Sequence, residues 1–279
     1  MLQQLLDVLA LEDTGNDGFL GRNMHPEGFR VYGGQVLAQA LSAAQYTVDP
    51  GRPVHSQHAY FLREGKTDRP IRYEVERARD GGSFSSRRVV ALQGDSPILV
   101  CSLSFQLPDD SFDFQESLPE VCGPEELSSE RERALASGQL DEEFMITTGE
   151  DLDVRMVVPI DWRNPESRPG SLFSWMKTSD SLANDPALHR SLLTYFSDTM
   201  LLDAGLIQHG RSYWDSELQM ASLDHAIWFH GDFRADQWLL HTAELERNSG
   251  GRTLVRGRFY TRDGAHVATV MQQGLMRKR

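Results

Sequence analysis

The stretch SLLTYFSDTMLLDAGL, residues 191–206, is apolar on nearly every side when it is written as a helix. At 3.6 residues per turn, Asp198 shares a face with Tyr195 and Leu202. A carboxylate buried among such residues costs several kcal/mol unless it is hydrogen-bonded or lines a polar cavity. We therefore expect a helix from Pro186 to Leu206 that is covered all round, in which Asp198 is either capped by a neighbouring strand or loop or lines a polar cavity.

A second helix of the same kind is expected over residues 33–48, GGQVLAQALSAAQYTV. The segments that follow the two helices can be laid over each other. His58 falls on His225 and Gly81 on Gly250, at offsets of 167 to 169 residues. A repeat at near-constant spacing indicates a duplicated structural unit, so the chain is expected to be two fused copies.

Runs rich in Val, Ile, Tyr and Phe, separated by Gly and Asp turns, predict an antiparallel meander in each copy. In the first copy the strands are expected at 54–63, 71–79, 83–92 and 97–107. In the second copy they are expected at 152–162, 170–179, 218–230, 237–246, 253–261 and 266–276. Because a sheet that curves around a helix can bury it on nearly all sides, the fold class is α+β.

The domain organisation follows from this pattern. A first unit is expected over residues 1–110 and a second over residues 151–279. The acidic segment between them, residues 111–150, is poor in β-branched residues. It is expected to be a linker, partly helical and mostly solvated.

Composition excludes several classes of partner. The 279 residues carry a formal net charge of −13, which argues against nucleic acid, and 39% hydrophobic content supports a large core. The longest apolar runs fall far short of the ~20 residues that span a bilayer. The start of the chain has no basic export signal, and Cys101 lies in an apolar strand-like run. We therefore expect a cytoplasmic protein without a membrane or nucleic-acid partner.

Familiar catalytic patterns are missing from the sequence. The segment DGGSFSS lacks the last glycine of G-x-S-x-G, and no H-E-x-x-H or paired cysteine pattern occurs. No dinucleotide or P-loop glycine pattern occurs either. A serine-hydrolase elbow, a zinc site and an enzyme that needs NAD or ATP are therefore disfavoured.

Six ordered motifs carry a family likeness: GGQVLAQAL, HSQHAYFLREG, DGGSFSSRRV, YFSD, SLDHAIWFH and QQGLMR. Over about residues 5–277 the chain resembles the acyl-CoA thioesterase II family, whose members are two fused hot-dog units (a double hot dog). Each unit in that family is a helix wrapped by an antiparallel sheet. The resemblance implies hydrolysis of acyl-CoA to free fatty acid and coenzyme A, with neither metal nor organic cofactor.

The resemblance also implies three catalytic residues, which would hold the hydrolytic water. These are Asp198 in YFSD, Ser222 in ASLDH and Gln272 in VMQQGLMR. Their types suit the chemistry, because a carboxylate accepts a proton while a hydroxyl and an amide fix the water oxygen. A one-residue slip in the last strand would exchange Gln272 for Gln273, since neighbours point to opposite faces. Asp203 is a rival acid, although it is expected near the helix end, where a solvated or capping role costs less.

Substrate contacts are less clearly marked. Gly33 and Gly34, at the start of the first helix, could offer backbone N–H groups to the oxyanion, or could simply form a tight turn. Arg87 and Arg88, in SSRRV, are the best candidates for the phosphates of CoA, or could instead lie on a solvated strand face. Of the repeat-equivalent histidines, His58 and His225, we expect an architectural role.

The expected function is therefore an acyl-CoA thioesterase. A protein that binds or senses acyl-CoA without turnover is the alternative, since a fold does not guarantee chemistry. A dehydratase acting at the acyl α and β carbons is a third candidate. Exposed sheet edges favour a homo-oligomer, a dimer or tetramer.

Overall fold

The computed structural model describes residues 2–24, 30–138 and 150–279. The helices are α1 (Leu2–Leu9), α2 (Gly33–Gln45), η1 (Pro124–Glu126), α3 (Glu130–Ser137), α5 (Pro186–Ser197) and α6 (Asp203–Ile207). The strands of the first half are β1 (Glu12–Gly15), β2 (Gly18–Gly21), β3 (Val54–Phe61), β4 (Ile71–Asp80), β5 (Phe84–Gln93) and β6 (Ser96–Gln106). The strands of the second half are β7 (Leu152–Met156), β8 (Leu172–Thr178), β9 (Leu218–Ser222), β10 (Asp224–Phe229), β11 (Leu239–Ser249), β12 (Arg252–Thr261) and β13 (His266–Lys278).

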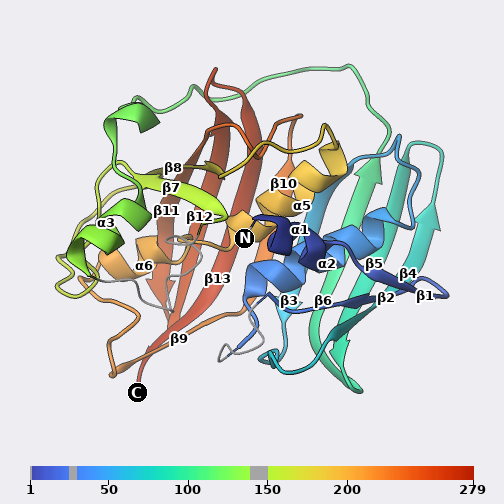
Figure 1. Cartoon of the computed structure of the whole chain (residues 1–279), viewed down its shortest axis with the longest axis horizontal. Coiled ribbons are helices and arrows are strands. Elements are labelled where there is room, and N and C mark those ends of the chain that lie inside the picture. Colours follow the sequence, from blue (N-terminus) through green and yellow to red (C-terminus); the bar gives the residue numbers. More distant parts are fainter. Residues whose placement is uncertain (1, 25–29, 139–149) are drawn as a thin grey trace.

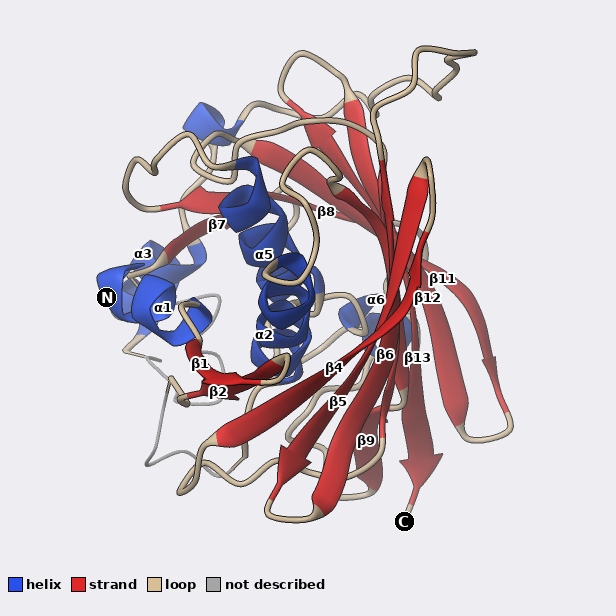
Figure 2. Ribbon diagram, turned by 90° about the vertical axis from the view of Figure 1, so that its right-hand side faces the viewer, coloured by secondary structure: helices blue, strands red, loops and turns tan. Residues whose placement is uncertain are grey.

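Within the described residues, the strands form one 13-stranded antiparallel sheet. Its order is β1-β2-β4-β5-β6-β3-β10-β13-β12-β11-β8-β7, with β9 paired to β13. The sheet curves around α2 and α5, which lie on its concave side (Figure 2). The double hot-dog α+β fold is thus confirmed.

The two halves join through the pairing of β3 with β10. His58 lies opposite Ala226, and Ala59 lies opposite His225. In the repeat His58 corresponds to His225, and Ala59 corresponds to Ala226. His58 therefore pairs with the counterpart of Ala59, and Ala59 pairs with the counterpart of His58. This is the pattern that a two-fold relation between the halves requires. On the concave side α2 also packs on α5, and Oγ of Ser42 lies 3.1 Å from Oγ of Ser191.

The buried helix of the second half is shorter than expected. Helix α5 ends at Ser197, and Asp198 occupies the cap position with φ −85° and ψ −9°. Met200 has φ 62°, and a new short helix, α6, begins at Asp203. The single helix expected up to Leu206 was therefore wrong. Its apolar pattern could not show the break, because a buried turn and a buried helix are equally apolar.

Three further strand features differ from expectation. Strands β1 and β2, of four residues each, were missed. They are joined by Asn16 and Asp17, both with positive φ, as a tight hairpin turn requires. The strand expected over 218–230 is divided at Leu223 into β9 and β10.

The segment after β6 is partly helical and mostly exposed over its described residues, 107–138, in line with expectation, whereas residues 139–149 lie outside the described part. It also packs on the outer face of the second half, which was not expected. Leu118, Val121 and Leu127 pack on a small apolar cluster around Trp175. The indole N–H of Trp175 donates to the backbone oxygen of Cys122 at 2.9 Å. Figure 1 shows this segment, in green, crossing from one half to the other. Among the described helices, none is long and apolar enough to cross a membrane.

Candidate active site

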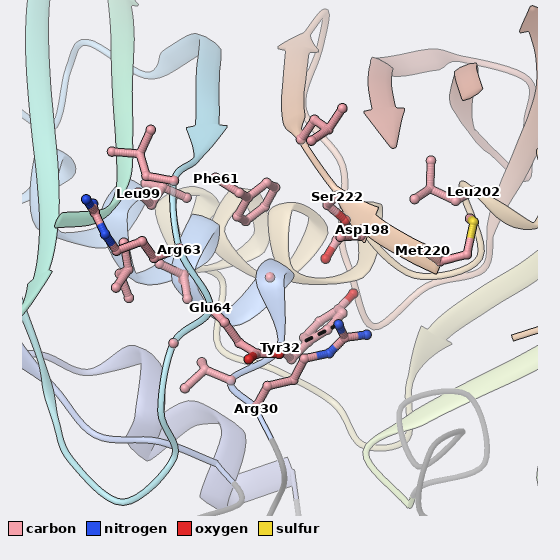
Figure 3. A pocket seen from close by; sticks show the side chains of 18 of the residues that line it. Arg30, Tyr32, Phe61, Arg63, Glu64, Leu99, Asp198, Leu202, Met220 and Ser222 are labelled. Atoms are coloured by element: carbon pink, nitrogen blue, oxygen red, sulfur yellow. Dashed lines mark ion pairs between the residues drawn. The ribbon is translucent and has the colours of Figure 1, made fainter. Parts of the chain in front are cut away.

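A cavity of about 490 Å³ lies between the two halves. The residues that line it from the first half include Arg30, Tyr32, Gly33, Phe61, Arg63, Glu64 and Leu99. Those from the second half include Asp198, Met200, Leu202, Asp203, Tyr213, Met220 and Ser222. In Figure 3 the side chains of Asp198 and Ser222 lie between the apolar pair Leu202 and Met220 on one side and Phe61 on the other.

Asp198 and Ser222 line this cavity, and the fully buried side chain of Gln272 joins them without lining it. The side-chain amide of Gln272 donates to Oδ1 of Asp198 at 2.6 Å and to Oγ of Ser222 at 2.9 Å. They come from three elements: the end of α5, the end of β9 and the middle of β13. The residues selected from the sequence are therefore brought together, and no slip to Gln273 occurs. Gln272 is fully buried, whereas the backbone N–H of Gln273 donates to Asp224.

The N-terminus of α2 approaches the carboxylate from the other half of the molecule. The backbone N–H of Gly34 hydrogen-bonds to Asp198. A Cβ added at Gly33 would lie 2.6 Å from Oδ2 of Asp198, and one at Gly34 would collide with the backbone oxygen of Tyr195. Both glycines are therefore needed for close approach. The N–H of Gly34 serves the carboxylate, so only Gly33 remains a candidate donor to substrate.

The pKa of Asp198 is raised to about 6, mainly because burial disfavours the charged form. The hydrogen bonds from Gln272 and from the N–H of Gly34, together with the charge of Arg30, oppose this rise. The side chain keeps partial exposure to the cavity. Asp198 is therefore largely ionised at neutral pH, yet more basic than an ordinary carboxylate.

A second acid, Asp203, also lines the cavity, but in a different environment. Only 4% of it is exposed, and Tyr213 donates its hydroxyl to Oδ1 at 2.7 Å. Burial raises the pKa of Asp203 to about 7, with a further contribution from Glu130. The expectation of a solvated or capping position for Asp203 was therefore wrong, because the helix break at Asp198 turns α6 inward.

The two arginines proposed for phosphate binding lie elsewhere. Arg87 is 2% exposed. Its guanidinium donates to the side chains of Thr47 and Asp80 and to the backbone oxygens of Thr47, Arg79 and Ser86. Arg88 is exposed and lies 3.5 Å from Glu76. Neither lines the cavity, so their assignment to substrate binding is not supported. Arg87 occupies an inward position of β5, which an arginine cluster in the sequence does not reveal.

Two other arginines lie at the cavity and were missed. Arg30 and Arg63 both line it, and Arg30 is 4.0 Å from Glu64 (Figure 3). The side chains of Arg30 and Glu64 are 54% and 58% exposed. No spacing in the sequence marked these residues, because the loops that carry them come together only in the fold.

The repeat-equivalent histidines have different surroundings. His58 is exposed and packs edge-to-face on Trp228, with ring centroids 4.9 Å apart. His225 is 1% exposed, and its Nε2 lies 2.9 Å from Oγ of Ser197. Equivalence in the repeat therefore does not mean an equivalent role.

The fold and the cavity define a class of protein: a double hot-dog thioesterase whose cavity lies at the junction of its units. Family models described as "Acyl-CoA thioesterase" and "Acyl-CoA thioesterase N-terminal domain" match residues 161–275 and 20–106. Acyl-CoA thioesterase 2 of Haemophilus influenzae is 36% identical over 99% of this chain and 98% of its own length. Acyl-coenzyme A thioesterase 8 of Homo sapiens is 35% identical over 97% of this chain and 88% of its own length.

Solved structures agree. The crystal structure of the acyl-CoA thioesterase II TesB2 from Mycobacterium marinum superposes with a TM-score of 0.82 at 36% identity. It covers 99% of this chain and 97% of its own. A hot-dog protein of unknown function from Alicyclobacillus acidocaldarius, 17% identical with a TM-score of 0.76, shares the fold. The chain belongs to the acyl-CoA thioesterase family.

Proposed function

We propose that this enzyme hydrolyses acyl-CoA to a free fatty acid and coenzyme A by attack of a water molecule that Asp198, Ser222 and Gln272 hold. Membership of a thioesterase family supports the reaction. The observation that carries the assignment of residues is the Gln272 amide, which bridges the carboxylate and the hydroxyl at 2.6 and 2.9 Å. Asp198 lines the cavity, and because each carboxylate oxygen has two lone pairs it can accept a proton from water in addition to the bonds from Gln272 and Gly34.

The steps follow from these contacts. Water donates one proton to Asp198 and accepts a hydrogen bond from Ser222, whose own oxygen accepts from Gln272. Its oxygen attacks the thioester carbon, and the C=O pair moves to oxygen. The intermediate collapses with cleavage of the C–S bond, and Asp198 returns the proton to the departing CoA thiolate. Because a thiolate leaves readily, orientation and modest base assistance suffice without a covalent intermediate.

A donor for the oxyanion is available at the start of α2. Gly33 lines the cavity, and the first N–H groups of a helix have no partner within the helix. We assign the N–H of Gly33 to the developing oxyanion, where the positive end of the helix dipole also favours negative charge.

The two sides of the cavity differ in polarity. Leu202 and Met220 lie on one side of Asp198 (Figure 3), and the charged residues Arg30 and Arg63 also line the cavity. We assign the acyl chain to the apolar side and the phosphate-bearing part of CoA to the two arginines, which suits their chemistry.

The test is release of free thiol from acyl-CoA substrates of two to sixteen carbons, followed with a thiol reagent. Asp198→Asn should lower kcat by at least ~100-fold, the usual scale for a positioned base. Retention of most activity by a folded Asp198→Asn variant would refute the assignment. Saturable acyl-CoA binding by the unmodified protein without thiol release at any length would instead favour the binding or sensing protein.

Assembly and location stay predictions. We propose a homodimer or tetramer, since edge strand β1 is exposed along its whole length. Light scattering after size exclusion checks this, and a single monomeric species at micromolar concentration would contradict it. The cytoplasmic location expected from the sequence is checked by fractionating cells that express the full chain.

A further inference from the structure

The side-chain amide of Gln272 must keep one of its two possible orientations, which differ by exchange of its nitrogen and oxygen. Its nitrogen donates to both Asp198 and Ser222, so its oxygen must point away from them. A side-chain amide can turn by 180° at little cost unless both ends are held. In the turned state the amide oxygen would face the carboxylate, and two acceptors would oppose each other. Oε1 of Gln272 is buried and has no protein donor within hydrogen-bonding geometry.

The residue opposite Gln272 on the neighbouring strand is His225. Ala226 on β10 pairs with Met271 on β13, so the next pair in this register is His225 with Gln272. Both side chains are buried and share the inner face of the sheet. Cβ atoms of opposed residues lie about 4.5–5.5 Å apart. Among the described residues, Nδ1 of His225 is, like Oε1 of Gln272, a buried atom with no hydrogen-bond partner of good geometry, although the nearby Gln272 side chain raises the pKa of His225 and partly offsets the effect of burial.

The other ring nitrogen is already held. Nε2 of His225 lies 2.9 Å from Oγ of Ser197, the residue directly before Asp198. Burial lowers the pKa of His225 to about 4, so the ring is neutral and has one donor and one acceptor. The hydroxyl of Ser197 lies 2.9 Å from both the backbone oxygen of Thr194 and Nε2 of His225, and its single proton has these two acceptors. When this proton goes to Nε2, the ring proton lies on Nδ1 and faces the amide oxygen. This tautomer satisfies both unpartnered atoms at once.

We propose that His225 is a positioning residue that fixes the Gln272 amide through an Nδ1–H···Oε1 hydrogen bond. The inference rests on the proposed role of Gln272 in holding water. The resulting series of hydrogen bonds runs from Ser197 through His225 and Gln272 to Asp198. Because Ser197 and Asp198 are consecutive residues, the series begins and ends at the C-terminal end of α5.

Three substitutions of His225 distinguish a role in positioning the Gln272 amide from a role in packing alone. Asparagine at this site places an amide N–H near the position of Nδ1, glutamine reaches only toward Nε2, and leucine offers no donor. His225→Asn should keep kcat within about 3-fold of the unmodified enzyme. His225→Leu and His225→Gln should lower kcat by about 10- to 100-fold with little change in KM, as misplaced groups do. If His225 only filled space, the kcat of His225→Leu would match or exceed that of His225→Asn, and that order of kcat values would overturn the proposal.

The pH profile gives a second readout. The bond from Gln272 lowers the pKa of Asp198, so its loss in His225→Leu should move the acid limb of kcat/KM to higher pH. The limb should stay in place in His225→Asn. The titratable groups facing Asp198 are Arg30, Tyr32 and Tyr213, and none is altered in these variants. An unmoved limb in His225→Leu would contradict the inference.

Two controls complete the design. His241 is equally buried in β11 and stacks on Phe259 away from the cavity, so His241→Leu should alter stability but leave kcat and the acid limb unchanged. Asp198→Asn tests the proposed function separately. If Asp198→Asn is inactive while the His225 series shows equal kcat, only the positioning role fails.

Discussion

In the proposed mechanism a single carboxyl group, that of Asp198, is expected to set the working pH of this enzyme. Because the pKa of Asp198 is raised to about 6, the base form is lost as pH falls through that value. We expect kcat/KM to fall about tenfold per pH unit below pH 6 and to be nearly flat between pH 7 and 8. A pH–rate profile with one short-chain acyl-CoA checks this. An acid limb near pH 4 would show that burial does not raise the pKa of the catalytic base.

A second residue-scale prediction concerns Asp203. Its pKa is raised to about 7 from 3.8, so the folded protein binds more protons than the unfolded chain between these values, and stability falls as pH rises. Asp203→Asn stays neutral and keeps the acceptor for Tyr213. We expect its free energy of unfolding, relative to the unmodified protein, to be ~1–3 kcal/mol higher at pH 8 than at pH 4. Urea unfolding of both proteins at pH 4 and at pH 8 tests this. An equal difference in the free energy of unfolding at the two pH values would refute it.

Side-chain chemistry was predictable from the sequence only where a polar residue interrupts a buried pattern. Asp198, Ser222 and Gln272 each stood out in this way or through the family motifs, and the fold brings them together. Arg87 and Asp203 were misplaced because charge alone does not tell whether a side chain faces inward. Arg30 and Arg63 lie on loops whose approach depends on tertiary structure, so no periodic signal marks them.

At the scale of elements, α2 matters because its N-terminus touches the acid. Gly34→Ala would drive a Cβ into the backbone oxygen of Tyr195 and push the helix from Asp198. We expect a loss of ~1–3 kcal/mol in stability, with a fall in kcat larger than the folded fraction explains. Thermal melting and thiol release measure the two effects. Gly82→Ala, whose Cβ would meet nothing within 4 Å, is the matched control and should change neither.

Most helices and strands of the sheet were predictable, because strands with one buried face and turns rich in Gly and Asp leave clear patterns. The break after Ser197 was not, since burial on all sides removes the polar face that marks a helix end. Strands β1 and β2 were too short to show alternation. The acidic segment is mostly exposed over its described residues, but its packing around Trp175 was not predictable, because the few apolar side chains that make this contact are spread thinly along it.

At the scale of the whole molecule, we expect the halves to be inseparable. Residues 151–279 alone would lose the β3–β10 pairing, the contact of α2 with α5 and the N–H of Gly34. The fragment should show less than about 1% of the full chain's activity, because its base is unsupported and its cavity is open on one side. Thiol release and a melting curve of the purified fragment test this. A cooperatively melting, active fragment would contradict the proposed dependence.

The pairing of β3 with β10, which joins the two copies, has a consequence for how the copies diverged. Residues 33–48, which include α2, contain no aspartate or glutamate. The matching helix of the second copy, α5, is followed directly by the acid Asp198. Once both copies were tied in one polypeptide, a helix start from one could be specialised to serve the base of the other. Mutations in either copy are then inherited together, and we expect each full chain to have one reaction centre. Titration of active sites should count one per polypeptide.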